Sequence, residues 1–230
     1  MLYTEETVRE NLRSREGRRV FFLGKNDRLT SAARDYLSRE RIEILPAEEA
    51  KPERYRLLGG GYAEEKPEHM THLDGITLAP KTHPRIVFRG KMDTLEARLL
   101  ACRLAVPEFD RELGELLDYT RILLRREVLG EPVEEGTLLG MSAQELRLRS
   151  HFPQDYYGQP HFMPEAADGP VMAQLNLARA CAREAELAAA AAFTGPDGQV
   201  LRPDLIKAMN RLSSAIYLLM IRQKRKVGTL

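Results

Sequence analysis

Two long segments near the end of the chain are almost entirely apolar and have helical spacing, and they constrain the fold most. They cover residues 170–186 and 201–221, and a turn-forming Gly-Pro-Asp-Gly lies between them at 195–198. Two helices of this length joined by a short turn pack antiparallel. Their apolar faces need further helices to cover them, so the pattern predicts a helical bundle.

Polar side chains interrupt both apolar segments. Arg179, Arg183 and Glu186 are spaced four and three residues apart, so they share one helix face. Asn210 and Arg211 occupy positions that would otherwise belong to the core. Burying such groups unpaired is costly. Two explanations remain open from the residues alone: a salt-bridge network that fixes the helix register, or a cleft that binds a polar anion.

Helical spacing continues upstream. Helices are expected over residues 84–105, from about 108 to 128, and from 142 onwards. Ser142 with Glu145 three residues later resembles a capping box. Residues 152–163, rich in proline, glycine and aromatic side chains, are expected to form a loop. Arg89, Asp93 and Glu96 share one face of the first of these helices. An ion pair between Arg89 and Asp93 within the helix is the simplest explanation for these charges.

The N-terminal segment has the pattern of a small α/β unit. After a first short helix, we expect a strand at 20–23, a helix at 32–39 and a second strand at 42–45. Residues 47–82 are rich in Glu, Lys, Pro and Gly, which favours a long connecting loop. The chain is therefore expected to be mainly α, with an extension and loop over 1–80 and a helical bundle over 81–230.

Composition excludes several functional classes. The chain has 230 residues and a formal net charge of +1, which gives no support for nucleic-acid binding. No segment approaches the roughly 20 apolar residues that span a bilayer. The acidic first residues lack the apolar core of a secretion signal, so we expect a cytoplasmic protein whose two thiols, Cys102 and Cys181, are reduced. Glycine-rich nucleotide motifs and Cys-x-x-Cys are absent.

Several ordered segments resemble the ATP:cob(I)alamin adenosyltransferases. They are His-Pro-Arg and the following helix at 83–97, Leu-Ala-Arg-Ala-Cys-Ala-Arg-Glu-Ala-Glu at 177–186, and the segment 201–214 with its Met-Asn-Arg-Leu-Ser-Ser. The ethanolamine-utilisation branch of this family is the most similar, and it shares the segments 28–34, 71–73, 129–132 and 163–169. These segments extend over nearly the whole chain, which makes the resemblance far more specific than any one motif.

The resemblance implies a fold, a reaction and a set of site residues. Such enzymes are helical bundles that transfer the 5′-deoxyadenosyl group of ATP to cob(I)alamin, release triphosphate and use Mg²⁺. The product, adenosylcobalamin, is the cofactor of ethanolamine ammonia-lyase. The resemblance assigns catalysis to Arg183, Arg179 and Asp93, with Asp93 pairing with Arg179 across a subunit interface. It assigns substrate binding to Glu186, Asn210, Arg211, Arg85 and Phe162.

The resemblance also implies partners and a location. A flavin reductase would supply electrons, and ethanolamine ammonia-lyase would take the product. A homo-oligomer is implied, for which we expect a trimer, in the cytoplasm and in association with a bacterial microcompartment. Neither nucleic acid nor a membrane is expected as a partner.

Four departures from the family pattern matter. The His and Cys-Cys-x-x-Cys metal motif of the branch is missing, and residues 59–65 stand in its place, so we expect no cysteine-bound iron or zinc. Glu184 stands where the family has Arg. The Thr-x-x-Gly-Asp phosphate loop is not found, and Lys81, Thr82, Arg85 or the Gly59 loop are its possible substitutes.

The fourth departure concerns the aromatic residue that displaces the lower cobalt ligand in the wider family. Either Phe162 or His161 falls at its position. A protein of another class remains the alternative to an enzyme, namely a non-catalytic corrinoid-binding or scaffold protein with the same bundle.

Overall fold

The computed structural model describes residues 1–15, 18–50 and 55–227. They divide into two compact units, and each is described by itself. The first consists of Met1–Ile86 with Val128–Glu131, and the second of Val87–Glu127 with Pro132–Leu230. The expected mainly α fold with a small α/β part near the N-terminus is confirmed.

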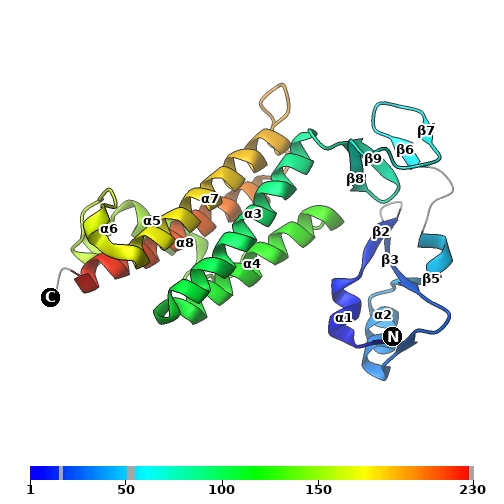
Figure 1. Cartoon of the computed structure of the whole chain (residues 1–230), viewed down its shortest axis with the longest axis horizontal. Coiled ribbons are helices and arrows are strands. Elements are labelled where there is room, and N and C mark those ends of the chain that lie inside the picture. Colours follow the sequence, from blue (N-terminus) through cyan, green and yellow to red (C-terminus); the bar gives the residue numbers. More distant parts are fainter. Residues whose placement is uncertain (16–17, 51–54, 228–230) are drawn as a thin grey trace. The chain divides into compact units, whose positions relative to one another are not determined.

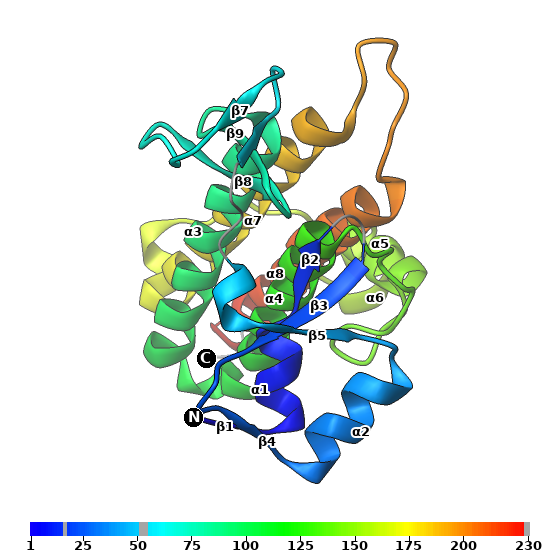
Figure 2. The same cartoon turned by 90° about the vertical axis from the view of Figure 1, so that its right-hand side faces the viewer.

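A three-stranded sheet lies at the start of the first unit. Its elements are α1 (Glu5–Glu10), β2 (Arg13–Arg15), β3 (Arg18–Leu23), α2 (Ser31–Arg39) and β5 (Glu43–Pro46). In the sheet β3 is central, with β2 antiparallel on one side and β5 parallel on the other (Figure 2). Helix α2 makes the crossover that a parallel pair needs. The expected strand, helix and strand are thus confirmed, and Thr30 caps α2 by accepting from the Ala33 N–H at 3.2 Å.

The core of this part is small and apolar. It consists of Val8, Leu12, Phe21, Leu29, Ala33, Tyr36, Leu37 and Ile42. Strands β1 (Leu2–Tyr3) and β4 (Arg28–Leu29) pair in parallel beside it. This pair was not expected from the sequence, because strands of two residues have no readable periodicity.

The expected long loop over residues 47–82 is wrong for most of its length. After a 3₁₀ turn at Ala47–Ala50, a four-stranded sheet forms with the order β7-β6-β9-β8. Its strands are β6 (Tyr55–Leu57), β7 (Tyr62–Ala63), β8 (Met70–Asp74) and β9 (Thr77–Pro80). The glycines that suggested a loop make the turns instead: Gly60 and Gly61 between β6 and β7 have φ of 98° and 83°. Residues 51–54 lie outside the described part of the chain.

The second unit is a helical bundle. Its elements are α3 (Pro84–Ala105), a 3₁₀ turn at Pro107–Phe109, α4 (Asp110–Leu129), α5 (Ala143–His151), α6 (Pro153–Tyr157), a 3₁₀ turn at Ala166–Asp168, α7 (Gly169–Phe193) and α8 (Pro203–Val227). Helices α3, α4, α7 and α8 lie side by side, and α5 packs against α8 (Figure 1). The expected helices and the Ser142–Glu145 capping box are confirmed.

Helix α6 corrects the first half of the loop that the sequence predicted at 152–163, whereas residues 158–163 contain no helix or strand. Proline is common in the first turn of a helix because its missing N–H has no partner there, and Pro153 opens α6. Gly158 closes it in the left-handed region with φ of 64°. The same proline and glycine that suggested a loop therefore delimit a short helix.

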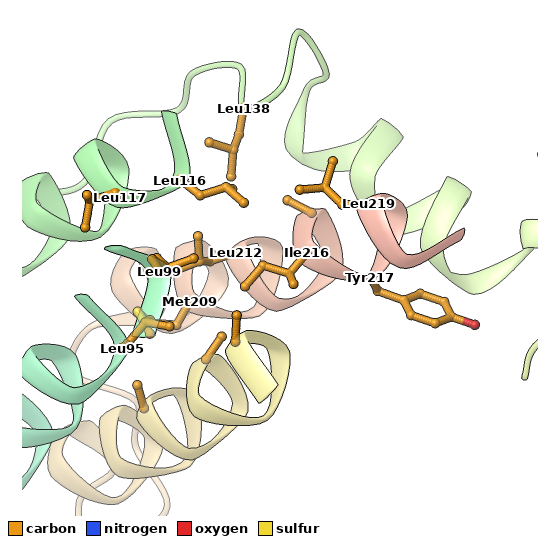
Figure 3. Packing of buried hydrophobic residues seen from close by; sticks show 14 of the residues in the cluster. Leu95, Leu99, Leu116, Leu117, Leu138, Met209, Leu212, Ile216, Tyr217 and Leu219 are labelled. Carbon is orange, nitrogen blue, oxygen red and sulfur yellow. The ribbon is translucent and has the colours of Figure 1, made fainter. Parts of the chain in front are cut away.

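Helix α8 is the central helix of the bundle. From residue 211 to 221 every side chain is buried, whichever face it occupies. Leu212 and Ile216 of α8 meet Leu95 and Leu99 of α3 and Leu116 of α4 (Figure 3). Each fully buried leucine contributes roughly 1.5–3 kcal/mol through apolar burial. Arg211, Ser213 and Ser214 of α8 are therefore embedded in an apolar part of the molecule.

Ion pairs between neighbouring helices use several of the charges on α3. Arg89 Nε donates to Glu127 Oε2 of α4 at 2.6 Å, and Glu127 is completely buried. Arg121 of α4 donates to Glu96 at 3.1 Å. The Arg89–Asp93 pair considered from the sequence does not form. None of the helices in the described residues is both long and apolar enough to cross a membrane.

Candidate functional site

Glu186 and Asn210 join the two long helices of the bundle. Asn210 Nδ2 of α8 donates to Glu186 Oε1 of α7 at 2.5 Å, and the Ser213 hydroxyl lies 3.4 Å from the other carboxylate oxygen. Arg211 Nη2 donates to Asn210 Oδ1 at 2.5 Å. The only acidic residue of the predicted face thus has its hydrogen bonds on α8, and it forms no ion pair with an arginine among the described residues.

Arg179 and Arg183 lie one turn apart on α7, and neither has a carboxylate within ion-pair distance in the described chain. Arg179 is half-buried, and its guanidinium carbon lies 5.2 Å from the ring centre of Tyr217. Arg183 is exposed. Desolvation and the charge of Arg183 lower the pKa of Arg179, against a smaller raising effect of Tyr217. An environment that disfavours the cation in this way is stabilised by a bound anion.

Arg211 is buried on the side of α8 that faces α4 and α5. Only 8% of it is exposed, and Nε and Nη1 have no hydrogen-bond partner among the described residues. It lines a cavity of about 80 Å³ together with Asp204 and the loop at 133–138. Desolvation and the nearby charge of Arg147 lower its pKa, and Glu186 opposes this. Arg147, an exposed cation of α5, was missed in the sequence because its helix shows no apolar stripe.

An aromatic cluster connects the segment before α7 to α8. Tyr217 stacks on His161 and on Phe162, with ring centres 5.9 Å apart in both pairs. The Tyr217 hydroxyl lies 3.0 Å from His161 Nδ1. Lys224 pairs with Asp168 and lies 5.5 Å above the Phe162 ring. Phe162, one of the two residues expected to face the corrinoid, is therefore fixed to α8.

Tyr217 is the functional candidate that the sequence did not reveal. It stands within the aliphatic stretch of α8, where an aromatic residue reads as core. Figure 3 shows its ring pointing away from the leucine cluster. The sequence did offer one indication. A tyrosine hydroxyl buried among aliphatic side chains needs a hydrogen-bond partner, so Tyr217 had to contact a polar group.

The remaining sequence candidates make none of these contacts. Asp93 is exposed on α3 and has no ion-pair partner among the described residues. Glu184, which replaces the family's arginine, accepts from Lys91 of α3 at 2.8 Å. Arg85 belongs to the first unit, where it lines a cavity of about 590 Å³ with Arg56 and Thr77.

Metal-binding groups are not assembled by the residues described. Among them, no group of three or more His, Cys, Asp or Glu side chains could hold an ion.

Comparison with known proteins identifies the family of the chain. Residues 61–223 match the model of the cobalamin adenosyltransferases. The chain is 30% identical over 242 residues to the corrinoid adenosyltransferase EutT of Escherichia coli strain K12, covering 95% of this chain and 90% of that protein. EutT of Salmonella typhimurium strain LT2 matches with the same identity and coverage. The chain belongs to the cobalamin adenosyltransferase family.

Proposed function

We propose that this protein transfers the 5′-deoxyadenosyl group of ATP to cob(I)alamin and so makes adenosylcobalamin for ethanolamine utilisation. Family membership supports the reaction, and the similarity to EutT over 95% of the chain supports its setting. That similarity also includes the N-terminal sheet, which precedes the segment matched by the family model.

The reaction asks the protein for orientation and charge stabilisation. Co(I) attacks C5′ of ATP, the C5′–O bond breaks, and the triphosphate leaves with the bonding electrons. No side chain is needed as a nucleophile. Positioned cations beside the leaving group lower the barrier, because they stabilise the negative charge that develops on the triphosphate in the transition state. Arg179 and Arg183 are assigned this role, and Asn210 with Glu186 holds the nucleotide.

One observation carries this assignment. Arg179 and Arg183 have no carboxylate partner in the described chain, while the carboxylate on their own face is hydrogen-bonded by Asn210. Guanidinium groups left unpaired beside one another repel and are suited to a polyphosphate. A structural salt-bridge network would have paired them with Glu186.

A homo-oligomer is supported by the outer faces of α3 and α7. Lys91 and Glu184 bring these helices together, and both present apolar side chains to solvent. The exposed apolar residues include Ala97, Leu100, Ala101 and Leu104 on α3, and Ala173, Leu177, Ala180 and Leu187 on α7. Exposed apolar surface of this kind marks an interaction site. We assign Asp93 to an ion pair with Arg179 of a neighbouring subunit, in a trimer.

Phe162 is the better choice for the residue that faces the cobalt. Both ring nitrogens of His161 are engaged, by the Tyr217 hydroxyl and by the His151 carbonyl, at 3.0 and 3.1 Å. The imidazole is thus occupied, whereas Phe162 supplies an apolar ring. An apolar ring on the lower face would exclude a ligand there and favour four-coordinate Co(II), which is easier to reduce.

The partners of the proposed reaction follow from its chemistry. Reduction of Co(II) to Co(I) requires an electron donor, for which a flavin reductase is proposed. Ethanolamine ammonia-lyase is proposed to take the product, in the cytoplasm or in a microcompartment. Arg211 is kept as a nucleotide-binding residue, and Arg85 as a phosphate ligand, on the resemblance alone.

Equilibrium binding of ATP with Mg²⁺ tests the nucleotide site. Arg183→Ala and Arg179→Ala are each expected to weaken ATP binding by about 10- to 100-fold, the usual size of a charge-assisted hydrogen bond. Arg111→Ala is the control, because its side chain is 90% exposed on α4. Wild-type affinity in Arg183→Ala would overturn the assignment.

A further inference from the structure

We propose that Tyr217 is a positioning residue that holds Arg179 ready for the triphosphate, and that His161 in turn fixes Tyr217. This rests on the proposed function, because it adds residues to the same nucleotide site. Neither residue touches the nucleotide in this proposal. Both act through the guanidinium of Arg179.

The contact between Arg179 and Tyr217 orders a cation without using its donors. The guanidinium carbon lies 5.2 Å from the ring centre, and the described chain offers Arg179 no carboxylate. A carboxylate of the same subunit would occupy N–H groups and offset the charge. An aromatic face attracts the cation through its quadrupole and uses none of its five N–H groups, which stay available for phosphate and for the Asp93 carboxylate of a neighbouring subunit. Tyr217 therefore gives Arg179 a fixed place while its donors stay available for phosphate.

The Tyr217 ring is itself held on several sides. Only 9% of Tyr217 is exposed. His161 stacks on it with an angle of 13° between the rings, and Phe162 with 27°. The phenol is thus restrained by its own packing and by the loop before α7, which the Lys224–Asp168 pair ties to α8.

The hydrogen bonds of His161 decide which group donates in the contact between its Nδ1 and the Tyr217 hydroxyl. Its Nε2 lies 3.1 Å from the carbonyl oxygen of His151, which can only accept. In the neutral imidazole Nε2 therefore carries the hydrogen, and Nδ1 accepts from the Tyr217 hydroxyl at 3.0 Å. A phenol that donates its hydrogen bond has a more electron-rich ring, which strengthens its attraction for Arg179.

Burial and repulsion from Arg183 explain why Arg179 needs such support. The two arginines stand one turn apart on α7, and desolvation together with the charge of Arg183 lowers the pKa of Arg179, whereas Tyr217 raises it. Without the ring, the free protein would leave Arg179 to swing away from its neighbour. Binding of triphosphate would then have to order the side chain, at the expense of affinity.

A double-mutant cycle on ATP affinity tests the proposal. The variants are Tyr217→Leu, Arg179→Ala and the double variant, with ATP and Mg²⁺ binding measured at equilibrium and folding checked by circular dichroism. Tyr217→Leu is expected to weaken ATP binding by about three- to thirtyfold, the range of a cation–π contact. In the Arg179→Ala background, Tyr217→Leu should not change the ATP affinity further, because the guanidinium that Tyr217 positions has been removed. Tyr217→Phe should retain most of the affinity.

Two further variants keep the test decisive. His161→Ala changes an exposed side chain and leaves the core intact, and it should show the same dependence on Arg179 with a smaller effect. Tyr156→Leu is the control, because it removes a ring 5.5 Å from a different arginine, Arg149. Equal losses with and without Arg179 would overturn the proposal. Unchanged ATP binding in Arg179→Ala alone would instead refute the nucleotide site itself.

Discussion

At the level of single side chains, the hydrogen-bond partner of Glu186 determines whether Arg179 and Arg183 of α7 form ion pairs within the helix. The sequence places Arg179, Arg183 and Glu186 on one face, and helical geometry makes that prediction safe. It does not say which groups pair, because pairing depends on the neighbouring helix. The structure shows Glu186 accepting from Asn210 of α8, and neither arginine has an ion-pair partner among the described residues. Tyr217 could not be identified from the sequence for the same reason, since the role proposed for it comes from contacts with a distant loop.

Asn210→Asp is expected to destabilise the protein. It would place a second carboxylate 2.5 Å from Glu186, and repulsion with loss of the hydrogen bond should cost about 1–3 kcal/mol. For a chain of this size that corresponds to a fall in Tm of roughly 2–10 °C. Adding Glu186→Gln should restore much of the loss in the same thermal scan. A stable Asn210→Asp single variant would contradict the contact.

The two cysteines should differ in reactivity. Burial raises the pKa of the Cys102 thiol to about 11, so its thiolate is scarce at pH 8. Cys181 is free and only half-buried. Alkylation of the native protein followed by mass spectrometry should modify Cys181 and spare Cys102 until denaturant is added. Equal rates at both thiols would contradict the burial of Cys102.

Among the helices and strands, the long elements were predicted from the sequence and the short ones were missed. The bundle helices carry apolar spacing over many turns, so α3, α4, α7 and α8 could be read directly. Strands β6 to β9 contain two to five residues each and are interleaved with glycine and proline. Their stability comes from pairing across the sheet, which a local pattern does not record.

Asp204 is expected to attach the loop before α5 to the start of α8. Desolvation opposes its ionisation, but hydrogen bonds from Arg202 and from the Val133 and Leu205 N–H groups lower the pKa to about 2. A lowered carboxyl pKa stabilises the fold above the unfolded value near 4, and this contribution is lost as the pH falls toward 2. Asp204→Asn should therefore lose on the order of 1–2 kcal/mol at pH 7, and less at pH 3.

Thermal unfolding of both proteins between pH 7 and pH 3 measures this difference. Asp118→Asn is the matched control, because that carboxylate is 74% exposed. The gap in Tm between wild type and Asp204→Asn should narrow as the pH falls. A gap that stays constant would show that the carboxylate charge is not what holds the loop.

For the chain as a whole, the order of the motifs identified the family, but the assembly could not be read from them. The exposed apolar faces of α3 and α7 become visible only once the bundle is built, because the same residues read as core in the sequence. Leu104 and Leu187 are 81% and 67% exposed, well beyond what core residues show. A protomer with such faces is expected to associate.

Leu104→Glu is expected to break the oligomer. A charge in an apolar contact loses burial and gains a desolvation penalty. Light scattering after size exclusion should give a multimer for the wild type and a smaller species for the variant. Leu58→Glu, an exposed leucine of the first unit, should leave the mass unchanged. If the wild type is a monomer at assay concentrations, Asp93 cannot act on a neighbouring subunit.

The corrinoid spectrum during a reaction tests the proposed function most directly. Purified protein is mixed with chemically reduced cob(I)alamin, Mg²⁺ and ATP, without added transition metal. Light-sensitive adenosylcobalamin should appear with the wild type and the Arg111→Ala control, and be strongly reduced with Arg183→Ala. Absence of product from wild-type protein that still binds ATP would contradict an independent adenosyltransferase built on these residues.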